Sequence, residues 1–281
     1  MKKIFSIVLF ALALCVAVSC STEQAKEPIK VISYNIRCGV NPGQDGENNW
    51  EYRKQASINM INDEKPTIFG LQEALPPHLE YLKEQLPQYA SYGIARDDGK
   101  TEGEYMTIYY LKDEVELLDC GTFWLSETPE TPSMGWDAAC KRTCTWAKMR
   151  MKRSGKEFAY LNTHLDHVGK VAQREGLALM MKRAAEIVPD GMPVFVTADF
   201  NCVTSDPIFE PIKAVMKDAR ETAPQTDRRA TFNGWKPNAT AVIDHIFYRG
   251  AEPKSFRVLC DKNYGAPYIS DHYPVVLEAE F

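Results

Sequence analysis

The sequence predicts a mixed α/β (α+β) fold in a single domain, and two observations support this. Short runs rich in β-branched and aromatic residues alternate with segments of helical pattern along most of the chain. We see no internal repeat, and the loop-rich segments 41–49 and 129–136 are each followed at once by a new helix or strand pattern. The chain has 281 residues, of which 44% are hydrophobic and 25% charged, a composition typical of a globular protein with a large core.

The pattern places the elements in order along the chain. Strands are expected at 30–35, 67–71, 105–111, 115–125, 143–151, 158–163, 194–197, 242–248 and 275–279. Helices are expected at 50–62, 78–85, 170–187 and 207–216. The last helix has Asp206 as its expected N-cap and Pro207 at its first position. The helix over 170–187 carries its apolar residues roughly on one face, at Val171, Leu177, Met180, Met181, Ala184 and Ile187.

The N-terminus has the features of an export signal. Lys2 and Lys3 precede an apolar run that is too short for a transmembrane helix and that ends at Ser19-Cys20. The segment Ala17-Val18-Ser19-Cys20 resembles a bacterial lipobox, in which the cysteine becomes the lipidated first residue; the alternative is ordinary cleavage with Cys20 incidental. We therefore expect a signal peptide at 1–19, a lipidated tether at 20–29 and the folded domain at 30–281. The protein would be exported and lipid-anchored to the membrane through Cys20, in the periplasm or on the outer surface of the cell envelope.

The net charge bears on the binding partners of the protein, and the cysteines bear on its disulfides and metal sites. The formal net charge is -5, and removing residues 1–19 with their two lysines leaves 31 basic against 38 acidic residues, or -7. Proteins that grip long nucleic acids are usually basic, so a nucleic-acid partner is possible but is not favoured by charge. We expect a monomer. Six cysteines follow the tether, and their spacing matches neither a small disulfide scaffold nor a zinc site, so mostly buried free thiols are expected: Cys38, Cys120, Cys140, Cys144, Cys202 and Cys260.

Several apolar runs end in polar side chains. These endings are Asn35, Glu73, His164, Asp199 with Asn201, Asp244, and Asp271 with His272. A single carboxylate or histidine at a strand end is usually a turn or cap residue. Six such endings in one chain instead indicate a site built where strands converge on a rigid scaffold.

The chemistry of these residues fits a phosphate site. Glu73 and Asp271 are hard oxygen ligands, which suit Mg²⁺ or Mn²⁺ and not zinc. Asp199 can orient or deprotonate a water molecule, and Asn201 can donate to a phosphate oxygen. The two histidines supply acid, base or electrostatic help, and Asp244 can hold one of them in the useful tautomer: His164 and His272.

The same residues carry a family resemblance that covers roughly residues 30–281. Ser33–Arg37, Leu71–Glu73, Asn162–Leu165, Ala198–Asn201, Ile243–Ile246 and Ser270–Val275 resemble, in order, the motifs of the DNase I-like endonuclease/exonuclease/phosphatase superfamily. The resemblance implies a four-layer sandwich of two packed mixed β-sheets flanked by helices. It also implies roles: Asn35, Glu73 and Asp271 around the metal, Asn35 and Asn201 on the phosphate, Asp199 on the water, and His272 (with Asp244) and His164 beside the scissile phosphate.

Two further positions are suggested by the resemblance. Glu104 resembles the acidic residue that supports the first histidine in DNase I-like nucleases, and the alternative is a solvated acid before a strand. Arg142 stands where the family often has a phosphate-contacting arginine, and bidentate phosphate binding suits arginine.

The resemblance implies a Mg²⁺- or Mn²⁺-dependent phosphoesterase. Its substrate is left open among nucleic acid, a phospholipid headgroup and a small phosphorylated metabolite, while inositol phosphates rank lower because that group's motifs are missing. The alternatives are a catalytically silent binding lipoprotein on the same fold and a purely structural envelope lipoprotein.

Overall fold

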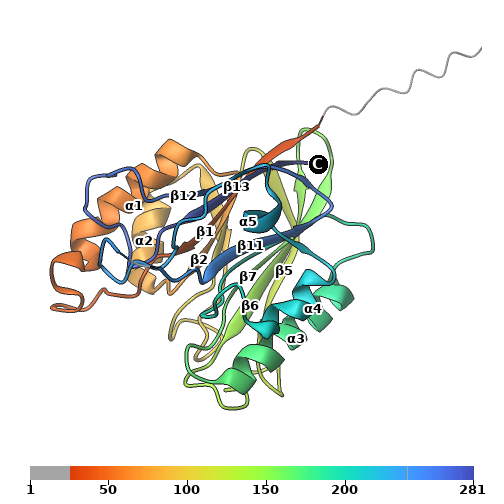
Figure 1. Cartoon of the computed structure of the whole chain (residues 1–281), viewed down its shortest axis with the longest axis horizontal. Coiled ribbons are helices and arrows are strands. Elements are labelled where there is room, and N and C mark those ends of the chain that lie inside the picture. The colour runs from red at the N-terminus through yellow and green to blue at the C-terminus, as the bar shows by residue number, and fades with distance from the viewer. Residues whose placement is uncertain (1–25, 239) are drawn as a thin grey trace, which may run out of the picture.

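Two β-sheets pack face to face, and helices cover both outer faces (Figure 1). The computed structural model describes residues 26–238 and 240–281. Helices α1 and α2 cover one sheet, and α3 and α4 cover the other (Figure 1). The four-layer α/β sandwich that we expected is therefore confirmed.

The first sheet has seven strands among the described residues, in the order β10-β12-β13-β1-β2-β4-β3. Its strands are β1 (Pro28–Asn35), β2 (Ile68–Gln72), β3 (Tyr89–Tyr92), β4 (Ile108–Leu111), β10 (Gln225–Thr226), β12 (Glu252–Val258) and β13 (Val275–Glu280). The central pair β1 and β2 is parallel, with Asn35 opposite Gln72. Because Glu73 follows Gln72 directly, the ends of these two strands bring Asn35 and Glu73 together.

The second sheet has six strands within the described ranges, in the order β5-β6-β7-β8-β11-β9. Its strands are β5 (Val115–Trp124), β6 (Thr143–Met151), β7 (Glu157–His164), β8 (Val194–Asp199), β9 (Lys217–Asp218) and β11 (Asp244–Arg249). Strand β8 is parallel to β7, with His164 opposite Asp199, and antiparallel to β11, with Asp244 opposite Asp199. Three of the expected site residues, His164, Asp199 and Asp244, therefore lie side by side where β7 and β8 end and β11 begins.

The helical elements are mostly short. They are η1 (Gly46–Asn48), α1 (Trp50–Glu64), α2 (Pro76–Gln85), α3 (Lys170–Ile187), η2 (Pro207–Phe209), α4 (Glu210–Lys213) and α5 (Ala219–Thr222). Helix α5 packs against β11 and β12, one strand from each sheet.

Side-chain alternation along the strands builds the core. On β1, Val31 contributes to the cluster between the two sheets, whereas its neighbour Ile32 contributes to the cluster beneath α1 and α2. A third cluster, which includes Val196 and Leu177, lies between the second sheet and α3. Successive residues of a strand point to opposite faces, so a central strand covered on both faces must be apolar almost throughout.

Most expected elements are present, with three differences. The helix expected at 207–216 is a 3₁₀ turn followed by α4, because Pro211 has no N–H to donate to the preceding turn. Asp206 nonetheless caps it, accepting a hydrogen bond from Ile208 N at 3.1 Å. The strand expected at 105–111 is shorter, since β4 begins at Ile108. In α3, Val171 is 37% exposed and does not belong to the buried face.

The cysteines are free thiols, as expected, but fewer of them are buried. Cys144 and Cys202 are buried, while the other four are partly exposed. The expected signal peptide and Cys20 lie outside the described residues. Strand β1 begins at Pro28, two residues before the expected domain boundary, and Glu27 exchanges backbone hydrogen bonds with Phe281. No helix within 26–238 or 240–281 has the length and apolar character needed to cross a membrane.

Candidate active site

A polar cleft of about 390 Å³ opens at the edge where the strands of both sheets end. Eight of the expected site residues line it: Glu73, Glu104, Arg142, His164, Asp199, Asn201, Asp271 and His272. The other two, Asn35 and Asp244, are buried beneath it and bond to residues of its wall. The structure therefore brings all the expected residues into one site.

The Asn35 side chain joins the two sheets beneath the cleft. Its Nδ2 donates to Glu73 Oε1 and to Asp199 Oδ2, each at 2.9 Å. Its Oδ1 accepts a hydrogen bond from Arg37 N at 3.0 Å. The amide oxygen is thus turned away from the carboxylates, and Asn35 acts here as a donor between them. The expected role of Asn35 as a metal ligand stays a prediction.

The His272 ring is held between two carboxylates. Its Nδ1 lies 2.9 Å from Asp244 Oδ2, and its Nε2 lies 3.6 Å from Asp199 Oδ2. Burial opposes a charged ring, but the charges of Asp244 and Asp199 outweigh it and raise the pKa of His272 to about 10. The ring is therefore a cation at neutral pH. On β11, His245 follows Asp244 and, as strand alternation predicts, its side chain points away from the cleft and bonds Asp218 at 2.8 Å.

The Asp199 carboxylate has a pKa close to neutral pH. Burial raises its pKa to about 7, and the charge of Asp244 adds to this while the His272 imidazolium opposes it. Its Oδ1 accepts from Asn201 N at 2.9 Å, which leaves Oδ2 facing Asn35 and the two histidines. A carboxylate with such a pKa can accept a proton during a reaction at neutral pH.

A second histidine of the cleft, His164, is neutral. His164 Nε2 lies 2.8 Å from Asn201 Nδ2 and 3.4 Å from Asp199 Oδ2. Burial, together with the charges of Arg142 and Arg96, lowers its pKa well below the ordinary value. His164 Nδ1 is buried and has no hydrogen-bond partner among the described residues. Asn201 reaches His164 from a left-handed turn, with φ of 51°.

The expected support of His164 by Glu104 is not found. Both carboxylate oxygens of Glu104 accept hydrogen bonds from Arg96, at 2.7 and 3.0 Å. Arg96 is eight residues earlier in the same loop and turns back toward Glu104 there. Glu104 thus lines the cleft as the partner of an arginine, because a bidentate guanidinium satisfies a carboxylate better than an imidazole does.

The acidic side of the cleft fits a hard cation. Ligand atoms of Glu73, Asp199 and His272 lie within 4.8 Å of one another. Arg37 is 3.7 Å from both Glu73 Oε2 and Asp271 Oδ2, so a cationic side chain already lies between these two carboxylates. Burial raises the pKa of Asp271, and the negative charge of Glu73 raises it further. Convergent carboxylates of this kind form an oxygen donor set that suits Mg²⁺ or Mn²⁺.

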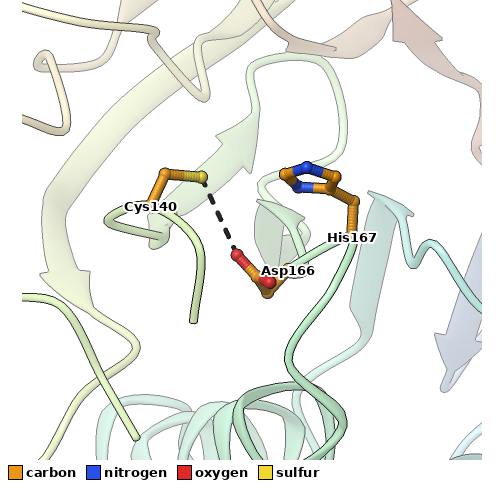
Figure 2. A group of neighbouring side chains, drawn as sticks. All are labelled: Cys140, Asp166 and His167. Carbon is orange, nitrogen blue, oxygen red and sulfur yellow. Dashed lines mark hydrogen bonds between the residues drawn. The ribbon is translucent and has the colours of Figure 1, made fainter. Parts of the chain in front are cut away.

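The opposite wall is cationic and is built around Arg142. Arg142 is 4% exposed, and its Nε donates to Asp166 Oδ2 at 3.2 Å. Its Nη2 lies 2.9 Å from His167 Nδ1. Cys140 completes this group, with its thiol 3.8 Å from Asp166 Oδ2 (Figure 2).

Sequence reasoning left several of these residues without a role. Arg37, Asp166 and His167 lie within or next to the family motifs, so their position in the sequence was a usable signal. Arg96 gave no such signal, because its contact with Glu104 is made within an irregular loop.

Comparison with known proteins agrees with this geometry. A model of the endonuclease/exonuclease/phosphatase family matches residues 32–272. A solved structure of an endonuclease/exonuclease/phosphatase from Bacteroides vulgatus is 39% identical, with a TM-score of 0.86, covering 91% of this chain and 100% of that one. A mannosyl-6-phosphatase from Bacteroides thetaiotaomicron is 34% identical, with a TM-score of 0.85, covering 90% and 100%. An uncharacterized protein of Acanthamoeba polyphaga mimivirus is 26% identical over 271 residues, which are 89% of this chain and 99% of that protein.

Proposed function

The chain belongs to the endonuclease/exonuclease/phosphatase family, and from this premise we propose that it is a divalent-metal-dependent phosphomonoesterase acting on a small, hydroxyl-rich phosphate ester. The observation that carries the proposal is the charged pair of His272 and Asp244 beside Asp199, facing the carboxylates of Glu73 and Asp271 across one cleft. This arrangement offers a base, a fixed cation and an oxygen donor set within reach of a single phosphate group.

The metal has a place in this scheme. Glu73 and Asp271 would hold Mg²⁺ or Mn²⁺, which as a Lewis acid offsets negative charge on the phosphate oxygens. Arg37, now between these carboxylates, would remain bound to Asp45, which holds its guanidinium at 3.0 Å.

The remaining residues transfer protons or stabilise negative charge. Asp199 orients a water molecule and accepts its proton as the water attacks phosphorus; the bond from phosphorus to the ester oxygen breaks, and that oxygen leaves as the alcohol with a proton from solvent. The His272 imidazolium, fixed by Asp244, stabilises charge on the phosphate. Neutral His164 and the Asn201 amide bond each other at 2.8 Å and line the wall beside Asp199, while Arg142 binds the phosphate oxygens from the opposite wall.

Three observations favour a small substrate. The cleft of about 390 Å³ has room for a phosphorylated sugar but is small beside a nucleic-acid duplex. The net charge of -5 does not favour a long polyanion. A relative with 34% identity along nearly the whole chain is a mannosyl-6-phosphatase. A hexose 6-phosphate is therefore the first substrate to test.

A substrate panel tests the proposal. Purified protein is assayed with mannose 6-phosphate, glucose 6-phosphate, p-nitrophenyl phosphate, bis(p-nitrophenyl) phosphate and single-stranded DNA, each with Mg²⁺, Mn²⁺ or EDTA. We expect the hexose 6-phosphates to be hydrolysed fastest, with activity lost in EDTA and in Asp199→Ala. Faster cleavage of the diesters would contradict the substrate class. If Asp199→Ala keeps full activity, the assigned site is wrong. If the wild-type protein hydrolyses no substrate of the panel, a silent binding protein is favoured.

We also propose that the protein is exported and lipid-anchored through Cys20. The basic N-terminus, the apolar run and the lipobox-like segment support this, and they lie outside the described residues. Membrane fractionation of cells that express the full chain tests it. Cys20→Ser should move the protein from the membrane fraction to the soluble fraction, and an unchanged distribution would contradict the anchor.

A further inference from the structure

The cluster of Cys140, Asp166 and His167 on the cationic wall has the residue types of a metal site, yet its contacts indicate another role. The three side chains come from two loop segments, one carrying Cys140 and the other carrying Asp166 and His167 (Figure 2). Besides the Cys140 thiol, four N–H groups donate hydrogen bonds to the Asp166 carboxylate. Its Oδ1 accepts from Val168 N and Gly169 N, and its Oδ2 accepts from Ala139 N and Arg142 Nε.

Arg142 also engages the third member of the cluster. Its guanidinium bonds both Asp166 and His167, so two of the three groups already have Arg142 as a hydrogen-bond partner. Asp166 therefore serves to tie Arg142 to two loop segments, and the cluster is organised around the arginine.

The contact between Arg142 and His167 has only one possible direction. A guanidinium carries donors and no acceptor, so His167 Nδ1 must present its lone pair to Arg142 Nη2 at 2.9 Å. His167 is then neutral, with its proton on Nε2. His167 is itself exposed and lines the cleft, whereas Arg142 is buried, so the histidine holds the arginine from the open side.

We propose that His167 is a positioning residue for substrate binding: by accepting a hydrogen bond from Arg142, it aims the free guanidinium N–H groups at the phosphate. This inference rests on the proposed function. Of the five N–H groups of Arg142, one bonds Asp166 and one bonds His167, which leaves three for the cleft. A guanidinium fixed at both Nε and Nη2 cannot rotate, so its remaining donors keep the planar arrangement that matches phosphate oxygens.

Three substitutions of His167 separate this role from a general structural one. His167→Asn places an acceptor oxygen near the position of Nδ1, His167→Gln places its polar atoms near Nε2, and His167→Ala provides neither. We expect the Ala and Gln variants to raise KM about tenfold with kcat within about threefold, because a hydrogen bond to a charged group is lost. The Asn variant should stay within about threefold of wild type in both parameters.

Binding of inorganic phosphate, measured by calorimetry with Mg²⁺ present, gives a second readout. Its Kd should rise about tenfold in the Ala and Gln variants and be restored in the Asn variant. Val168→Ala is the matched control, because the exposed Val168 side chain follows His167 in the sequence and makes no hydrogen bond to Arg142. Thermal unfolding of each variant checks that it is folded.

The phosphate-binding measurements test the role of His167 independently of the proposed phosphatase activity. If wild type hydrolyses no substrate in the panel, the proposed function fails, and the phosphate isotherms still test His167. If His167→Asn binds phosphate as weakly as His167→Ala, or if all three variants bind like wild type, the positioning role is wrong. If Val168→Ala weakens phosphate binding as much as His167→Ala, the loss does not depend on the hydrogen bond to Arg142 and the inference is overturned.

Discussion

Asp244 holds His272 through both carboxylate oxygens, with Oδ2 at 2.9 Å and Oδ1 at 3.1 Å from Nδ1. Asp244 is the first residue of β11, directly opposite Asp199 at the end of β8, so the sheet register itself places a base and a fixed cation side by side.

Asp244→Asn should lower kcat about a hundredfold at pH 7 with a small change in KM, since an amide cannot stabilise the imidazolium. The pKa of His272 is about 10 because of Asp244 and Asp199, and removing one charge lowers it. The variant should therefore lose activity as pH rises through the lowered pKa, a loss that wild type shows only at higher pH. A kcat profile from pH 5 to 10 measures this, and superimposable profiles would contradict it.

Glu73→Gln should raise the Mg²⁺ concentration for half-maximal activity by at least about tenfold, because the site loses a charged ligand. The same variant should lose most of the Mg²⁺-induced rise in melting temperature, which reports binding without catalysis. Glu84→Gln removes an exposed acid on α2 and serves as the control. Equal Mg²⁺ responses in wild type and Glu73→Gln would exclude Glu73 as a ligand.

Glu104→Ala should act mainly on stability. It leaves the Arg96 guanidinium without its bidentate partner, at a cost of about 2 kcal/mol in the free energy of unfolding. Because Glu104 makes no bond to His164, kcat should fall less than about tenfold. Urea unfolding of Glu104→Ala, Arg96→Met and the double variant measures the coupling. A hundredfold loss of kcat at unchanged stability would restore the nuclease-like role of Glu104.

His78 should make the protein sensitive to acid. Burial, with the charge of Arg53, lowers the pKa of His78 to about 3, and its Nδ1 accepts from Leu75 N at 2.9 Å. The unfolded chain binds this proton near pH 6.5, so the contribution to stability is complete above that pH and is lost as pH falls toward 3. The slope is about 1.4 kcal/mol per pH unit for one proton. His78→Asn keeps an acceptor but does not titrate, so its urea midpoint should fall less steeply than that of wild type. Parallel curves would contradict this.

The site residues at the strand ends could be predicted from the sequence, because pairing of neighbouring strands places their ends next to one another. Asn35, His164, Asp199 and Asp244 each end or begin a strand, and each lies at the same edge. The partner of Glu104 was not predictable, because Arg96 is placed by a loop that carries no periodic pattern.

Four strands were also missed for physical reasons. Strand β12 contains Pro253 and charged residues, and its register shifts beside the proline, so its sequence lacks regular alternation. Strand β3 has four residues, and β9 and β10 have two each, which is too short for a period of two to be seen.

The central claim is that Glu73 and Asp271 hold one hard cation in the cleft, and crystals soaked with Mn²⁺ test it most directly. Anomalous diffraction should place a single strong peak within bonding distance of Glu73 and Asp271, on the side of the cleft that faces His272. A peak at Cys140, Asp166 and His167 instead, or no peak at the carboxylates in a crystal that binds Mn²⁺ elsewhere, would contradict the claim.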